Sequence, residues 1–141
     1  MNPLNDTRLL RHFPRRELDA QSWRRDLLAQ DDVWNFQMAA ADAAKVSRAG
    51  GLVTLGAHGQ LQGLGAHWEL WALAGEGAMT PMEALRAATI NGATYIGMDR
   101  ELGTIEAGKF ADMVMLDADP RDDIHNSTRI AFVIKNGGIW E

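Results

Sequence analysis

The sequence contains no cysteine and no long run of apolar residues. Without cysteine the chain forms no disulfide bond and no cysteine-based zinc knuckle, although the redox compartment stays open. No apolar run approaches the roughly 20 residues that cross a bilayer, and the N-terminus lacks the apolar core of a secretory signal. We therefore expect no membrane partner and a cytoplasmic location, with the periplasm as the alternative if an N-terminal region precedes this sequence.

Basic residues are outnumbered, since 14 lysines and arginines face 19 aspartates and glutamates and the net charge is −5. This balance predicts no nucleic-acid partner. Several arginines nevertheless gather within the first thirty residues: Arg8, Arg11, Arg15, Arg16, Arg24 and Arg25. Acidic residues are interspersed among them, so we interpret this segment as a solvated helix face or as an arm that contacts another subunit.

The first third of the chain predicts an arm followed by a helix. Residues 1–32 show no clean hydrophobic period, and we expect an arm with one short helix near residues 16–29. Asp31 and Asp32 then offer an N-cap with acidic charge at the positive end of a helix. Apolar residues recur at helical spacing over 33–48.

A short apolar run and a glycine-rich loop follow this helix. Leu52–Leu55 lies between glycines, which is typical of a strand buried on both faces of a parallel sheet. Residues 56–65 contain four glycines, and a loop at the carboxyl end of such a strand is where α/β folds place their chemistry. We expect a helix over 66–74, in which Trp68 and Trp71 share one face and pack in a core or an interface, with stacking on a substrate as the alternative.

The second half of the chain carries the clearest local signals. Thr80-Pro81-Met82-Glu83 has the spacing of a capping box with proline at the first helical position, and the predicted helix runs to residue 96, where Gly97 ends it. The period then changes to that of strands over 111–117 and from residue 130. Asn136-Gly137 predicts a tight hairpin turn, because both positions tolerate positive φ.

Two long motifs resemble the C-terminal part of metal-dependent amidohydrolases. Residues 79–93 are similar to the last helix of that family, and residues 102–117 resemble its signature LG-S-IE-x-GK-x-ADLVVLD nearly position by position. The segment GAHGQLQGLGAHWELW, residues 56–71, is similar to one group within the imidazolonepropionase-like and Xaa-Pro-dipeptidase-like branch. The resemblance covers about residues 33–141.

The resemblance implies an α/β fold in which the chain forms the end of a (β/α)8 barrel and part of a small β-sandwich. Residues 1–32 would then be the arm, 33–98 the last βα portion of the barrel and 99–141 the sandwich portion. It also implies zinc or another divalent metal at the barrel mouth, which activates a water for attack on a carbon–nitrogen bond. The ligands come mostly from earlier strands, and only the position that ends the eighth strand falls within this sequence.

That eighth-strand position maps onto His58, where most relatives have aspartate, and we predict His58 as the catalytic and metal-binding residue. An imidazole can ligate a metal or accept a proton, but it is not an anionic ligand. His67 is predicted to bind substrate, with a solvated histidine near a helix N-terminus as the alternative. Glu69 is interpreted as a first-turn carboxylate stabilised by the helix dipole. One histidine does not hold a catalytic metal by itself.

Three functions therefore remain open at this point. The chain is the C-terminal part of a metal-dependent hydrolase of carbon–nitrogen bonds, incomplete by itself and acting on a small-molecule or peptide substrate. Alternatively it is a non-catalytic remnant that associates with copies of itself, or a subunit that completes a split barrel. Unpaired strand edges and exposed apolar faces favour a homo-oligomer.

Overall fold

The computed structural model describes residues 7, 9–18, 35–58, 61, 63–75 and 78–140. The chain divides into two compact units, Met1–Asn35 and Phe36–Glu141. In the first unit, α1 spans Leu9–His12 and residues 15–18 are helical. Most of the helix expected near residues 16–29, and the N-cap expected at Asp31 and Asp32, lie outside the described residues.

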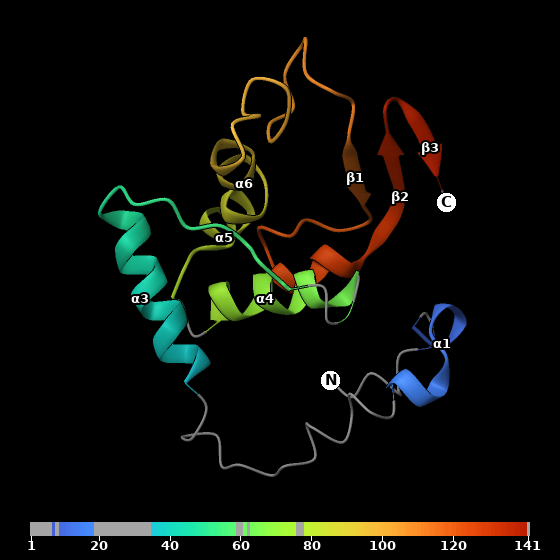
Figure 1. Ribbon diagram of the computed structural model, residues 1–141, viewed down its shortest axis with the longest axis horizontal. Helices are drawn as coiled ribbons and strands as arrows, with labels where there is room; N and C mark the ends of the chain where they lie inside the picture. Colours follow the sequence, from blue (N-terminus) through green and yellow to red (C-terminus); the bar gives the residue numbers. More distant parts are fainter. Residues whose placement is uncertain are drawn as a thin grey trace. The chain divides into compact units, whose positions relative to one another are not determined.

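The second unit combines helices with a small antiparallel sheet, which confirms a mixed α/β architecture (Figure 1). Its elements are, in chain order, α3 (Phe36–Arg48), α4 (Leu64–Ala74), α5 (Pro81–Ala88), α6 (Ile90–Tyr95), β1 (Met113–Leu116), the 3-10 helix η4 (Ile124–Thr128), β2 (Ile130–Lys135) and β3 (Gly138–Trp140). Within the described ranges, no helix is long and apolar enough to cross a membrane.

Helix α4 lies at the centre of the second unit and packs against α3, α5 and η4 (Figure 1). The core combines small alanines with larger side chains, so that the helices approach closely: Ala44, Leu70, Leu73, Met79, Ala84, Ala87 and Ile124. Trp71 is half-buried against this core, which confirms the packing role predicted for it.

The strand predicted at Leu52–Leu55 is wrong, because residues 51–57 have no regular secondary structure. The segment runs extended from α3 toward α4 (Figure 1), but no parallel neighbour pairs with it among the described residues. Its backbone groups bond to helices instead: Leu55 N donates to Ala87 O at 3.1 Å, and Asn91 Nδ2 donates to Val53 O at 2.9 Å. Backbone groups need partners wherever they lie, and here the ends of α5 and α6 supply them.

The single helix predicted over 81–96 is interrupted at Thr89, whose φ of −127° and ψ of −96° separate α5 from α6. Thr89 Oγ1 donates to Leu85 O at 2.7 Å, the back-bonding that lets threonine bend a helix. Gly97 follows α6 with φ of 73°, as predicted for the residue that ends the helix.

The capping box is confirmed and is extended by an arginine from α3. Glu83 N donates to Thr80 Oγ1 at 3.2 Å, and Thr80 N donates to Glu83 Oε2 at 2.7 Å. Arg48 Nη2 reaches both Glu83 Oε2 at 3.1 Å and Ala78 O at 2.8 Å. The end of α3 is therefore joined to the start of α5, and the hydrogen bonds from Arg48 and from the Thr80 backbone lower the pKa of Glu83 to about 2.

Glu83 should consequently contribute to acid sensitivity. A carboxyl whose pKa falls from 4.5 to about 2 on folding stabilises the fold fully above its unfolded pKa, and this contribution is lost as pH falls through the folded value. We expect Glu83→Gln to show a shallower fall of the thermal midpoint between pH 5 and pH 2 than the natural chain. Glu101→Gln, at an exposed carboxylate, is the control, and equal slopes for Glu83→Gln and the natural chain would contradict the assignment.

The three strands form one antiparallel sheet in the order β1-β2-β3. Met113 pairs with Ile134, and the register shifts between Met115 and Leu116. The predicted hairpin turn is confirmed, since Asn136 and Gly137 have φ of 51° and 78°.

Within the family-like motif over 102–117, Lys109 bonds to a turn, and Asp112 bonds to the hairpin from a position just before the start of β1. Lys109 Nζ donates to the carbonyls of Asp99 at 2.6 Å and Leu102 at 3.3 Å. Asp112 Oδ1 accepts from Asn136 N at 2.8 Å, and its carboxylate also pairs with Lys135. These contacts hold the start of β1 beside the hairpin.

Candidate functional site

The predicted site residue His58 lies on the loop that connects the extended segment to α4. Its side chain is exposed, and its backbone adopts the left-handed conformation with φ of 53°, which few non-glycine residues do. Just before it, Gly56 N donates to Glu69 Oε2 at 2.9 Å. The loop thus presents an exposed imidazole beside a backbone that α4 holds in place.

Glu69 does not have the role expected from the sequence. Because α4 begins at Leu64, Glu69 lies beyond its first turn, and the prediction of a first-turn carboxylate is wrong. Its side chain instead accepts the hydrogen bond from the Gly56 amide. This contact joins residues thirteen apart, so local sequence rules gave no signal for it.

The second predicted site residue, His67, is half-buried on α4 and faces η4. Its Nδ1 lies 3.1 Å from Ser127 Oγ, and Trp71 Nε1 donates to the same hydroxyl at 2.9 Å. Ser127 is only 5% exposed. These contacts tie α4 to η4 across about sixty residues of sequence, and substrate binding by His67 stays a prediction.

His125 joins this cluster, although its sequence neighbourhood suggested no function. Its ring lies 4.7 Å from the Trp71 ring, centroid to centroid, at an interplanar angle of 42°. Its Nδ1 is 2.8 Å from Asp123 Oδ1, and the hydrogen bond from His125 N to the same carboxylate lowers the pKa of Asp123. The spacing Asp-x-His was the available signal, since an aspartate commonly bonds the backbone two residues on.

A metal centre is not formed by the described residues alone. Among them, no group of three or more histidine, aspartate or glutamate side chains lies close enough to hold a metal ion. A catalytic zinc takes about three protein ligands and keeps one position open. His58 therefore supplies at most one ligand, and the described residues by themselves do not fit the metal that the resemblance implies.

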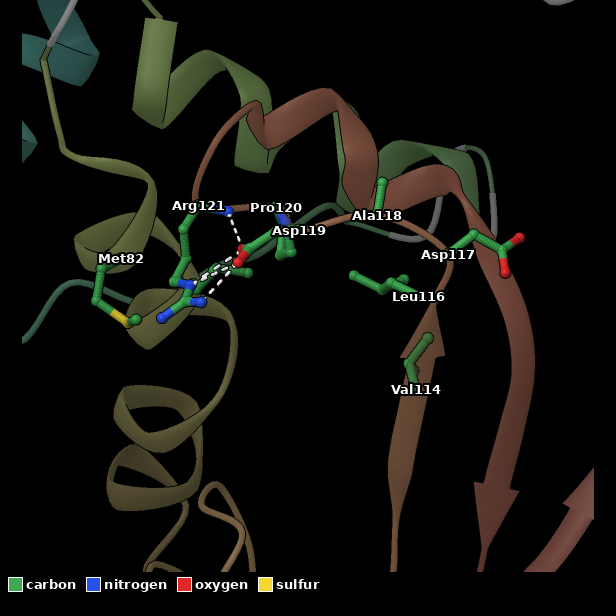
Figure 2. Close-up of a pocket in the computed structure, with 9 residues that line it drawn as sticks. Met82, Val114, Leu116, Asp117, Ala118, Asp119, Pro120 and Arg121 are labelled. Atoms are coloured by element: carbon green, nitrogen blue, oxygen red, sulfur yellow. Dashed lines mark hydrogen bonds and ion pairs between the residues drawn. The ribbon is translucent and has the colours of Figure 1, made fainter.

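A shallow hollow of about 470 Å³ lies beside α5 and β1, and Figure 2 shows its lining. Apolar Met82, Val114 and Leu116 form part of the wall. At its rim, Arg121 Nη2 donates to Asp119 Oδ2 at 2.6 Å, and this arginine lowers the pKa of Asp119 to about 2. Arg121 and Asp119 neutralise each other, so the arginine that lines this hollow is not available to bind an anion.

Comparison with known proteins places the chain in a family. Residues 35–139 match the model of the amidohydrolase family. The chain belongs to the amidohydrolase family, as the two motifs predicted.

Individual relatives lie in the expected branch. The imidazolonepropionase of Symbiobacterium thermophilum is 58% identical over 38 residues, which are 27% of this chain and 9% of that protein. The crystal structure of a putative prolidase from Bifidobacterium longum is 32% identical with a TM-score of 0.64, over 72% of this chain and 26% of that one. A Xaa-Pro dipeptidase structure with methionine in its active site is 28% identical, with a TM-score of 0.63, over 72% and 25%.

The relatives are much longer than this chain, which therefore corresponds to only a part of each of them. The chain spans about a quarter of the two solved structures and about a tenth of the curated imidazolonepropionase. What the chain shares with them is a mixed α/β portion of the family fold.

Proposed function

We propose that this chain forms the C-terminal part of a hydrolase of carbon–nitrogen bonds, in which polypeptide beyond these 141 residues completes the barrel and its metal site. The observation that carries the proposal is the exposed His58 on a loop held by α4, within a chain of this family. Residues 33–98 would close the barrel and 99–141 would join the sandwich.

The substrate class follows from the names of the relatives. A Xaa-Pro dipeptidase acts on a peptide bond, and a relative from Thermoanaerobacter pseudethanolicus, 52% identical over 42 residues, is named a deaminase. Both reactions break a bond between carbon and nitrogen. In the proposed enzyme His58 accepts the proton of the attacking water, a role for which imidazole is suited near neutral pH, and His67 borders the substrate.

A chimera tests the proposal directly. Residues 36–140 would replace the corresponding quarter of a Xaa-Pro dipeptidase, and hydrolysis of Xaa-Pro dipeptides and acyl-amino acids would be measured. We expect hydrolysis by the chimera, and neither hydrolysis nor stoichiometric zinc in the 141-residue chain purified without chelators. A folded, metal-loaded but inactive chimera would contradict the proposal, as would hydrolysis by the isolated chain.

A second candidate, self-association without catalysis, is favoured by the exposed apolar sheet. In β3, Ile139 and Trp140 are 66% and 67% exposed, and Val114 on β1 is 53% exposed. The strand β3 carries neither lysine nor proline, the residues that commonly protect an edge strand from pairing.

If copies of the chain associate, the average molar mass in solution rises with protein concentration. A charged side chain introduced on the edge strand β3 should lower this average mass. We expect Ile139→Lys to weaken association about tenfold or more, the effect of removing one well-buried interface anchor. Light scattering over a concentration series is the measurement. Tyr95→Lys, at a side chain that is 75% exposed on α6, is the control, and a monomer at every concentration of the natural chain would contradict this candidate.

A further inference from the structure

The backbone that leads to His58 is bonded to neighbouring helices, so the geometry at His58 depends on them. The extended segment before it is bonded to the helix ends through Val53 O and Leu55 N. Beyond these bonds, the chain passes Gly56 and enters a turn at His58 two residues later. Among the described residues, the polar contact nearest to His58 in sequence is the bond from Gly56 N to Glu69 Oε2, at 2.9 Å.

Glu69 is well placed to fix this turn. It is half-buried on α4, a helix anchored in the core by Leu70 and Leu73, so its own backbone is held on a rigid element. Near it on the same helix, a Cβ added at Gly65 would make an ordinary contact with Ala57 Cβ at 3.6 Å, so the start of α4 lies beside the loop. A hydrogen bond from a backbone amide to a carboxylate is also stronger than one between neutral groups. Glu69 therefore holds the backbone two residues before His58.

We propose that Glu69 is the positioning residue of the His58 loop: its carboxylate fixes the Gly56 amide and thereby the direction of the His58 imidazole. The catalytic consequence rests on the function proposed for His58. The positioning itself is a property of this chain and is measurable without substrate or metal.

Amide hydrogen exchange on the 141-residue chain tests the positioning. We expect the Gly56 amide to exchange about tenfold faster in Glu69→Ala, as for the loss of one charged hydrogen bond, and to an intermediate extent in Glu69→Gln, whose amide oxygen still accepts. The ring signal of His58 should move in the same order in nuclear magnetic resonance spectra. Glu106→Gln, at an exposed carboxylate on another loop, should leave both unchanged.

The outcomes separate this inference from the proposed function. Unchanged Gly56 exchange in a folded Glu69→Ala overturns the positioning, whatever the chimera does. Faster exchange with an unmoved His58 ring signal overturns it as well. Faster Gly56 exchange together with a shifted His58 ring signal supports the positioning even if the chimera is inactive. In an active chimera, Glu69→Gln should then lower kcat about tenfold with little change in KM.

Discussion

Gly103→Ala is expected to destabilise the second unit by about 3 kcal/mol, from strain at positive φ together with overpacking. Gly103 has φ of 92°, and an added Cβ would lie 2.7 Å from Ile90 Cα and 2.9 Å from Ala93 Cβ. The first of these atoms belongs to the backbone of α6, so relief requires a shift of the helix and not a change of rotamer. Against a typical total stability of 5–15 kcal/mol, this loss is a large share.

Gly108→Ala is the matched control for this variant. Gly108 has the same φ of 92°, but an added Cβ would meet no atom within 4 Å. It should therefore lose only the contribution of backbone strain, about 1 kcal/mol. Urea unfolding of the two variants separates the strain from the clash, and equal losses would show that the contact between Gly103 and α6 is not as close as described.

The second large effect concerns His58 in the active chimera. We expect His58→Asn to lower kcat about a hundredfold or more, because the loss of a positioned general base has effects of this size. His58→Asp should retain more activity than His58→Asn, since a carboxylate also accepts a proton.

His125→Asn is the control for that experiment. His125 is exposed, and its side chain contacts Asp123 and the Trp71 ring. Neither residue has a role in the proposed proton transfer, so the loss of His125 should leave kcat nearly unchanged. If His58→Asn and His125→Asn had the same small effect, His58 would not be the proton acceptor.

Local chemistry explains which parts of the fold were predictable. The capping box at Thr80 and the turn at Asn136-Gly137 depend on residues a few positions apart, and both form as predicted. Leu52–Leu55 was misread, because an apolar run predicts a buried strand only where other strands are present to pair with it. The break at Thr89 was missed, since threonine within a helix bends it only in some contexts.

The candidate site was predictable to a smaller extent for the same reason. His58 and His67 could be selected from a motif, but their surroundings depend on contacts over long separations. Ser127 meets His67 from sixty residues away, and Glu69 meets Gly56 from thirteen. The residues next to Ser127 and Glu69 in the sequence do not predict these distant partners.

The extended segment before His58 has one further consequence. Val53 O and Leu55 N belong to alternate residues, so in an extended chain they point to the same edge, and the ends of α5 and α6 occupy that edge. The backbone groups of Leu52 and Thr54 point to the opposite edge. A neighbouring strand can therefore pair on that side without breaking a described bond, whereas the two-sided pairing of a closed barrel requires α5 and α6 to release theirs.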